Sequence, residues 1–122
     1  MKYKKILVVE DNKEMLDLIS KKLRDEGAEV VSLTQGEEVL ETAKTFKPEM
    51  VLMDIVLEDI DGAEAVRRLQ QEALTQHIPV IFLSGIVTED TEDNETTIKV
   101  GDRVYTALGK PFKFADLLAK LA

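Results

Sequence analysis

The sequence has no cysteine, a single histidine and no long hydrophobic run among its 122 residues. The absence of cysteine excludes disulfide bonds and thiolate metal sites, and it suits the reducing cytoplasm, which is the location we expect. No stretch approaches the roughly 20 apolar residues that a membrane-spanning helix requires. The apolar residues near the N-terminus are too few for a signal peptide and stop at Glu10 and Asp11. Positive charge is also scarce, because the formal net charge is −8, and this argues against direct binding of nucleic acid or an anionic membrane.

Apolar runs alternate with helical patterns along the rest of the chain. The apolar runs predict five strands, at Ile6–Val9, Val30–Leu33, Met50–Met53, Val80–Leu83 and Val104–Leu108. Three of them are nearly continuous hydrophobic runs, which is typical of parallel strands covered on both faces. Amphipathic spacing predicts helices around residues 15–23, 39–46, 66–73 and 114–121. We therefore predict a single domain, residues 1–122, with an α/β fold: a doubly wound five-stranded parallel sheet (flavodoxin-like, strand order 2-1-3-4-5) and five helices.

The fourth helix of this fold has the weakest pattern. The segment TEDTEDNETTIKVGD (88–102) holds five carboxylates between Glu89 and Glu95, followed by only Ile98 and Val100 as apolar anchors. Several of its residues are β-branched, which disfavours a helix slightly. We expect a short or irregular helix with an acidic, solvated first turn. The alternative is a mobile surface that contacts a partner.

Polar residues follow the predicted strands at the edge where ligands bind. In doubly wound sheets this edge lies beyond the carboxyl ends of the strands. The first strand is followed by Glu10 and Asp11, the third by Asp54, the fourth by Ser84, and the fifth runs on into Lys110. Three carboxylates close together repel, and a hard divalent cation such as Mg²⁺ relieves the conflict. The sequence therefore predicts a Mg²⁺ seat built from acids of separate segments.

Each of these residues also has an ordinary structural interpretation. Asp11 fits an N-cap of the first helix, with Glu14 completing a capping box. Asp54 and Ser84 fit turn residues at strand ends, and Lys110 fits a solvated surface cation. The functional interpretation depends on their joint arrangement at four strand ends rather than on any one of them.

At these residues the chain resembles the receiver domains of two-component response regulators. Four segments carry the resemblance in order: the acid pair ED after the first strand, MDIVLEDIDG at 53–62, FLSG at 82–85 and GKPF at 109–112. It covers essentially the whole chain. It implies that Asp54 accepts a phosphoryl group from a phosphohistidine on a sensor histidine kinase or a phosphotransfer protein. The implied function is a phosphorylation-dependent signalling switch, a phosphoprotein that catalyses only its own phosphorylation and dephosphorylation.

The resemblance also implies a metal site with Mg²⁺ as the cofactor. Asp11, Asp54 and the backbone carbonyl of Val56 would hold the ion, and Glu10 would contribute through water. Phosphoryl transfer mostly requires positioning and the neutralisation of charge, and a dication supplies both.

The remaining site residues would act on the phosphoryl group itself. Lys110 would pair with Asp54 and then with a phosphoryl oxygen, while the Ser84 hydroxyl would donate to another oxygen. The resemblance implies a cis peptide bond between Lys110 and Pro111. Phosphorylation would then change the face made by the fourth helix, the fifth strand and the fifth helix, which a downstream protein partner or effector domain reads. The sequence leaves open the cognate kinase, the pathway, a homodimer through this face, and whether the chain acts alone or as part of a larger protein.

Two departures from the family pattern affect the output face. Receivers usually carry an aromatic residue three positions before the lysine, where this chain has Ala107. Tyr105 lies two residues earlier on the same side of the strand. It either replaces the usual aromatic switch with altered geometry or leaves that coupling absent. The stretch from Ser84 to Lys110 is also longer than usual.

The loop after Asp54 departs as well. Glu58 stands where a proline is common, and together with Asp59 and Asp61 it makes an acidic loop. We expect this loop to be solvated, and the alternative is that it attracts cations. Val56 and Ile86 flank the path of attacking water in receivers, and both are apolar, so we predict slow loss of the phosphoryl group.

Three other functions compete with the switch. A receiver-like scaffold that works without phosphorylation would use the altered output face as a constitutive docking surface. A magnesium phosphohydrolase would need a second acid two residues after the nucleophile, where this chain has Val56. A flavodoxin-type cofactor site would need a phosphate-cradling loop after the first strand, and the sequence EDNKE there would repel phosphate.

Overall fold

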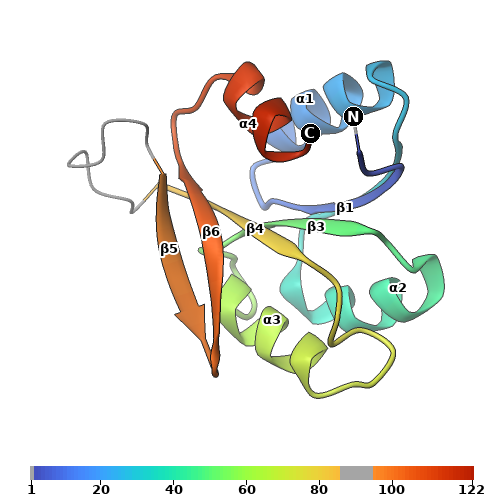
Figure 1. Cartoon of the computed structure of the whole chain (residues 1–122), viewed down its shortest axis with the longest axis vertical. Coiled ribbons are helices and arrows are strands. Elements are labelled where there is room, and N and C mark those ends of the chain that lie inside the picture. Colours follow the sequence, from blue (N-terminus) through green and yellow to red (C-terminus); the bar gives the residue numbers. More distant parts are fainter. Residues whose placement is uncertain (1, 86–94) are drawn as a thin grey trace.

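The computed structural model describes residues 2–85 and 95–122, which form a layered α/β fold (Figure 1). In chain order its elements are β1 (Lys5–Val9), α1 (Lys13–Asp25), β2 (Glu29–Leu33), the 3₁₀ helix η1 (Gly36–Glu38), α2 (Val39–Phe46), β3 (Met50–Asp54), α3 (Gly62–Gln70), β4 (Val80–Ser84), β5 (Glu95–Val100), β6 (Arg103–Gly109) and α4 (Phe114–Lys120). The strands form one sheet in the order β2-β1-β3-β4-β6-β5. All neighbouring pairs are parallel except β5 and β6. Within these ranges, every helix is too short or too polar to span a membrane.

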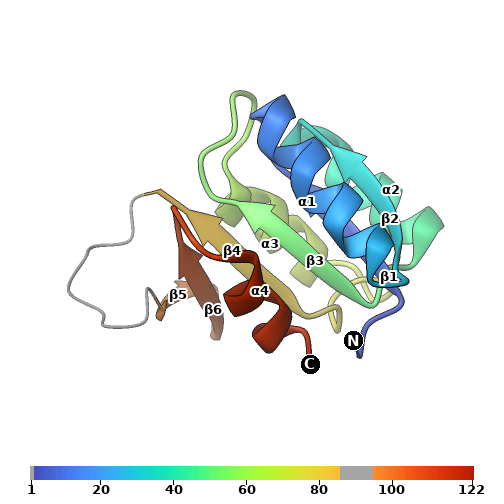
Figure 2. The same cartoon turned by 90° about the horizontal axis from the view of Figure 1, so that it is seen from above.

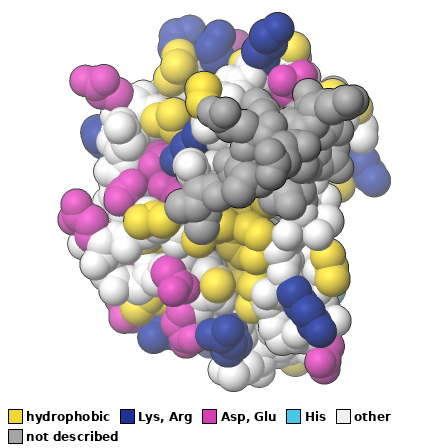
Figure 3. Space-filling view, turned by 90° about the vertical axis from the view of Figure 1, so that its left-hand side faces the viewer, with side chains coloured by type: hydrophobic (Ala, Val, Ile, Leu, Met, Phe, Trp, Pro, Cys, Tyr) yellow, Lys and Arg dark blue, Asp and Glu magenta, His cyan; other side chains and the backbone are white. Residues whose placement is uncertain are grey.

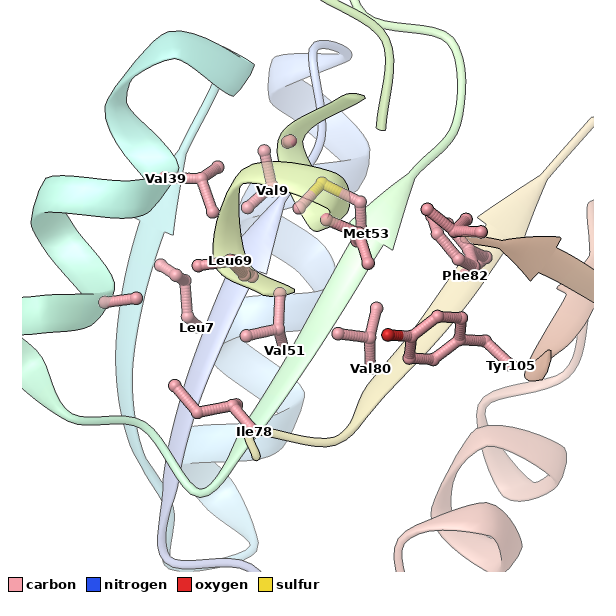
Figure 4. Close-up of a cluster of buried hydrophobic side chains, with 14 of the residues drawn as sticks. Leu7, Val9, Val39, Val51, Met53, Leu69, Ile78, Val80, Phe82 and Tyr105 are labelled. Carbon is pink, nitrogen blue, oxygen red and sulfur yellow. The ribbon is translucent and has the colours of Figure 1, made fainter. Parts of the chain in front are cut away.

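Helices cover both faces of the sheet and define two cores. In Figures 1 and 2, α1 and α4 lie on one face, and α2 and α3 lie on the other. Successive side chains of a strand point to opposite faces, so Leu7 and Val9 pack toward α2 and α3 (Figure 4). Ile6 and Val8 pack toward α1 and α4. This is why β1, β3 and β4 read as continuous hydrophobic runs: both of their faces are buried.

The predicted α/β fold is confirmed, but the number and order of strands were wrong in one region. The expected fourth helix is not formed over 95–100, where the chain makes the edge strand β5 instead. Ile98 and Val100 pack inward while Lys99 is exposed, which is the period of a strand and not of a helix. Gly101 has a positive φ of 62° and begins a two-residue turn that folds β5 back onto β6. The acidic entry turn predicted over 88–94 lies outside the described residues.

The β5–β6 hairpin is fixed to the C-terminal end of α3. Gln70 donates hydrogen bonds from Nε2 to the carbonyl oxygen of Val100 at 2.9 Å and to the hydroxyl of Tyr105 at 2.7 Å. The Tyr105 ring also packs edge-on against Phe82, with ring centroids 5.8 Å apart. Figure 3 looks at this side of the molecule and shows hydrophobic side chains in the middle of the face. The hairpin therefore belongs to the same packed unit as α3 and β4.

Candidate metal and phosphoacceptor site

Three carboxylates converge beyond the carboxyl ends of β1 and β3. Val9 pairs with Met53 in the parallel register, so Glu10 and Asp54 lie at the same level of the sheet. Glu10, Asp11 and Asp54 each offer a carboxylate oxygen, and these oxygens lie within 4.8 Å of one another. Glu10 is 0% exposed and Asp54 is 5% exposed, while Asp11 is the most exposed of the three. The structure thus brings together the three acids that the sequence placed at strand ends.

Lys110 reaches into this cluster from the end of β6. Its Nζ lies 2.5 Å from Oε1 of Glu10 and 3.2 Å from Oδ2 of Asp54. Burial lowers the pKa of Lys110, but the hydrogen bond to Glu10 and the charges of Asp54 and Glu10 outweigh it and raise the pKa above its ordinary value. The backbone places the side chain, because the Lys110 N–H donates to the carbonyl oxygen of Ser84 at 2.8 Å. The Lys110–Pro111 peptide bond is cis, as the resemblance implies.

The charges in the cluster do not balance. Three carboxylates face one ammonium, which leaves two formal negative charges in excess. Burial, followed by the hydrogen bond and charge of Glu10, raises the pKa of Asp11 above its ordinary value, although Lys110 opposes this. A hard dication prefers carboxylate oxygens as ligands. This cluster offers three carboxylates, of which Glu10 and Asp54 are buried and Asp11 is open to solvent. The residues present therefore fit Mg²⁺.

The capping interpretation of Asp11 was wrong. The N-cap of α1 is Asn12, whose side chain accepts a hydrogen bond from the backbone N–H of Met15 at 3.1 Å. The backbone N–H of Asn12 in turn donates to Oε2 of Glu10 at 3.1 Å. Because the neighbouring asparagine caps the helix, Asp11 is left to face the other two acids, and Glu14 completes no capping box with it.

Gly62 allows the backbone to fold closely over Asp54. Its N–H donates to the carbonyl oxygen of Ile55 at 2.7 Å, which closes the β3–α3 loop. A Cβ atom added at Gly62 would lie 2.2 Å from the carbonyl oxygen of Asp54 and 2.9 Å from Cγ of Met53. No side chain fits this position unless the loop that follows Asp54 moves.

Replacing Gly62 with alanine is therefore expected to destabilise the protein by about 2–3 kcal/mol, because the clash is with backbone and cannot be relieved by a rotamer change. Urea unfolding followed by circular dichroism measures this. Gly85→Ala is the matched control, since a Cβ atom there meets nothing within 4 Å. The control should stay within about 0.5 kcal/mol of the parent. Equal losses for the two variants would contradict the assignment of the close approach to Gly62.

Two further predicted site residues lie at the same edge. Ser84 is the last residue of β4 and is 1% exposed, and it pairs with Gly109 in the register of β4 and β6. Val56 lies in the loop after Asp54, with its side chain 57% exposed and its N–H donating to Oδ1 of Asp54 at 3.3 Å. Ser84 and the Val56 backbone thus lie at the same edge of the sheet as Asp54. Ile86 lies outside the described residues.

Tyr105 does not occupy the usual place of the aromatic switch. Tyr105 and Ala107 are both buried on the α3 side of β6, as their spacing predicts. The Tyr105 hydroxyl accepts its hydrogen bond from Gln70, far along the strand from the acid cluster. The ring is therefore held by Gln70 of α3 and by Phe82 of β4.

The acidic loop has structural contacts that sequence reasoning missed. Asp61 is the N-cap of α3 and accepts from the backbone N–H of Glu64 at 2.8 Å. Asp59 accepts from the backbone N–H groups of Gly36 and Glu37 at 2.9 and 2.8 Å. The signal for Asp61 was present in the sequence, because an acid three residues before Glu64 matches a helix start. Nothing local could have revealed the pairing of Asp59 with residues more than 20 positions away.

Comparison with known proteins gives a consistent result. The family model described as "Response regulator receiver domain" matches residues 6–122 of this chain. The chain is 30% identical over 118 residues to the alkaline phosphatase synthesis transcriptional regulatory protein PhoP of Bacillus subtilis, covering 97% of this chain and 47% of that protein. It is 30% identical over 90 residues to the polar-differentiation response regulator DivK of Brucella anthropi, covering 74% and 73%. Relative to PhoP and several other curated relatives, the chain spans about half their length.

Solved structures of similar proteins superpose on most of this chain. The receiver domain of the sensor histidine kinase PA1611 from Pseudomonas aeruginosa PAO1 superposes with a TM-score of 0.82 at 28% identity, covering 97% of this chain and 93% of that one. That structure is described with a magnesium ion coordinated in the active site cleft. The chemotaxis response regulator CheY4 of Vibrio cholerae superposes with a TM-score of 0.79 at 25% identity, covering 97% and 95%.

Proposed function

This chain belongs to the response regulator receiver domains, and from that premise we propose that it is a phosphorylation-dependent switch whose acceptor is Asp54. The observation that carries the proposal is the position of Asp54, which lies within 4.8 Å of two other acids and 3.2 Å from the Lys110 ammonium. An aspartate that only forms a turn would need neither the two nearby acids nor the Lys110 ammonium. The phosphodonor is the phosphohistidine of a sensor histidine kinase or phosphotransfer protein.

The proposed step is the formation of an acyl phosphate on Asp54. An oxygen of the carboxylate attacks phosphorus, the bond between phosphorus and the donor histidine nitrogen breaks, and the nitrogen keeps the electron pair. Asp11, Asp54 and the carbonyl of Val56 would hold Mg²⁺, with Glu10 contributing through water. When bound, the ion supplies positive charge that offsets the charge on the transferring group.

Lys110 and Ser84 would stabilise the product. Lys110 leaves Oδ2 of Asp54, which becomes part of the acyl phosphate, and pairs with a phosphoryl oxygen. Glu10 holds the ammonium throughout, since its contact with Nζ does not involve the acceptor. The Ser84 hydroxyl donates to another phosphoryl oxygen. The contacts of Lys110 and Ser84 with phosphoryl oxygens exist only when Asp54 is phosphorylated, so they would favour the conformation that makes them.

The signal would pass through the β5–β6 hairpin and α4. Ser84 ends the strand that pairs with β6, so a change at its hydroxyl acts directly on the β4–β6 edge of the sheet. Tyr105 is held by Gln70 and Phe82, which favours movement of the hairpin as a body over rotation of one aromatic ring. A downstream partner or effector domain would read this altered face.

The direct test is incubation with acetyl phosphate and Mg²⁺, followed by intact mass measurement. We expect a single phosphate adduct, which forms poorly when EDTA removes the metal. Sustained release of phosphate without an adduct would instead indicate a phosphohydrolase. No adduct and no release would favour the scaffold, which the fixed Tyr105 and the replacement of a helix by β5 also favour.

The phosphoryl group is expected to persist for minutes or longer, because Val56, whose backbone N–H donates to Asp54, has an apolar side chain that cannot orient water. Val56→Glu should shorten its lifetime by roughly one order of magnitude, since it adds one polar group near the attack path. Intact mass at successive times after removal of the donor measures the decay. Val104→Glu is the control, because Val104 is 62% exposed, like Val56 at 57%, but lies away from the site. Decay of the parent within seconds would contradict the prediction.

An apolar groove beside the site suits the protein donor. It lies between α1 and the residues that follow Lys110, has a volume of about 280 Å³, and is lined by Leu18, Pro111 and Phe112 among others. Leu18 is 54% exposed on this groove, so an amphipathic helix that carries the phosphohistidine could cover it. The groove includes Pro111, the residue after Lys110, which supports docking of such a helix beside Asp54.

Leu18→Arg is accordingly expected to slow phosphotransfer from a phosphorylated protein donor roughly tenfold, through loss of a buried contact at the interface. Labelling by acetyl phosphate should not change, because that donor needs no docking surface. Leu74→Arg is the control, since Leu74 is 63% exposed but belongs to a different surface. An equal loss with both donors would indicate damage to the site itself.

A further inference from the structure

Asp59 makes a contact that the proposed chemistry does not use. Its Oδ1 accepts from the backbone N–H of Gly36 at 2.9 Å and its Oδ2 accepts from that of Glu37 at 2.8 Å. Gln35, which precedes η1, supplies no side-chain cap of its own. One carboxylate thus joins the middle of the β3–α3 loop to the start of η1, across 22 to 23 positions of sequence.

The β3–α3 loop and the start of η1 also pack closely against each other. Gly36 is buried, and a Cβ atom added there would lie 2.7 Å from Cγ1 of Ile60 and 3.0 Å from its carbonyl oxygen. Leu57 is 8% exposed and packs at the same place, because its Cδ1 would lie 3.3 Å from a Cβ atom added at Gly36. The loop therefore has one defined position against η1, and Asp59 fixes it through two hydrogen bonds.

Hydrogen bonds also close the loop near its two ends. At the β3 end, Val56 donates to Oδ1 of Asp54 at 3.3 Å. At the α3 end, the N–H of Gly62 donates to the carbonyl oxygen of Ile55 at 2.7 Å. Asp59 lies between these two closures, so its two hydrogen bonds to η1, together with the packing of Leu57 and Ile60, limit how far the middle of the loop can move.

We propose that Asp59 is a positioning residue for the site: by tethering the β3–α3 loop to η1 it keeps the backbone around Val56 in place beside the carboxylates, so that Mg²⁺ meets a preformed seat. The inference rests on the proposed function, because it assigns a purpose to the loop position that Mg²⁺ binding requires. Burial raises the pKa of Asp59, but the backbone N–H groups of Glu37 and Gly36 outweigh it and lower the pKa, so the carboxylate stays ionised at neutral pH. Groups that orient metal ligands commonly affect metal affinity strongly.

A plain structural cap would behave differently. If Asp59 only stabilises η1 and α2, its loss lowers the melting temperature and leaves the affinity for Mg²⁺ unchanged. If it acts only through its negative charge, any acid of the same loop should have the same effect. Glu58 provides that comparison, because it is the adjacent residue, carries the same charge and is exposed.

The experiment is calorimetric titration of Mg²⁺ into the parent protein, Asp59→Ala and Glu58→Ala, with melting temperatures measured in parallel. We expect Asp59→Ala to weaken Mg²⁺ binding roughly tenfold and Glu58→Ala to weaken it much less. Asp59→Asn, which keeps one acceptor oxygen, should be intermediate and serves if the alanine variant folds poorly. Gly36→Ala, which disturbs the same contact from η1, should also weaken binding, and combining it with Asp59→Ala should add little.

The titrations and melting temperatures separate a failure of the positioning role from a failure of the proposed function. Equal weakening by Asp59→Ala and Glu58→Ala, or a lower melting temperature with unchanged affinity for Mg²⁺, would overturn the positioning role and leave the proposed function intact. Failure of the parent protein to bind Mg²⁺ at millimolar concentration would overturn the proposed function, and the positioning role with it.

Discussion

Replacement of Asp54 by asparagine is expected to abolish phosphorylation by acetyl phosphate and Mg²⁺, with no adduct detectable by intact mass. Loss of a nucleophile typically lowers a rate by several orders of magnitude, and the amide of asparagine cannot form the acyl phosphate. The fold should survive the substitution, because Lys110 keeps its 2.5 Å contact with Glu10 when the Asp54 charge is removed. The loss of labelling would then report chemistry rather than unfolding.

Asp116→Asn is the control for this variant. Asp116 is exposed in the first turn of α4, away from the acid cluster, and its replacement should leave labelling unchanged. The Asp54→Asn variant should also bind Mg²⁺ more weakly than the parent, because one of three nearby carboxylates has lost its charge. An adduct that persists in Asp54→Asn would show that another residue is the acceptor, and the site assignment would fail.

Replacement of Lys110 by methionine is expected to have a large effect on both stability and phosphorylation. Glu10 is 0% exposed, and without the ammonium its charge is buried with no partner of opposite sign among the contacts described for it. Leaving one member of a buried pair uncompensated typically costs about 3–5 kcal/mol. For a domain of about this size each kcal/mol lowers the melting temperature by roughly 4–8 °C. Thermal unfolding without metal measures the loss.

Phosphorylation of Lys110→Met should be slower by roughly two orders of magnitude, since one preorganised positive charge on the phosphoryl oxygens is gone. Glu10→Gln combined with Lys110→Met should recover part of the stability, because the fully buried Glu10 charge is removed while Asp54 still lacks the ammonium, but it should not recover the rate. Lys113→Met, at an exposed lysine three residues further on, is the control. A Lys110→Met protein as stable as the parent would show that Glu10 is accommodated by other groups.

Most of the acid site could be predicted from the sequence, because parallel strands end at one edge of a sheet. Asp54 directly follows a buried apolar run, and Glu10 follows another, so their approach requires only that these runs be neighbouring parallel strands. The same reasoning placed Ser84 and Lys110 at this edge. In contrast, the choice between Asn12 and Asp11 as the helix cap depends on backbone angles of single residues, which a pattern of residue types does not determine.

The replacement of the fourth helix could be anticipated only in part. The β-branched residues before Gly101 disfavoured a helix, but the prediction kept one because strands and helices alternate along the rest of the chain and acids suit the first turn of a helix. The strand forms because a two-residue turn allows the segment to pair with β6 and to bury Ile98 and Val100 against the α3 side. The hydrogen bonds of Gln70 to Val100 and Tyr105 then fix it. These hydrogen bonds join residues 30 and 35 positions apart, which local propensity does not describe.

By itself, the sequence determined the layers of this protein and the edge at which its chemistry lies, because hydrophobic periodicity and strand ends are local properties of the chain. Only the tertiary structure decided which groups meet: Lys110 with Glu10 across 100 positions, and Asp59 with the start of η1. Such contacts depend on the register and closeness of distant segments. They are set by the packing of the whole sheet and its helices and not by any one stretch of residues.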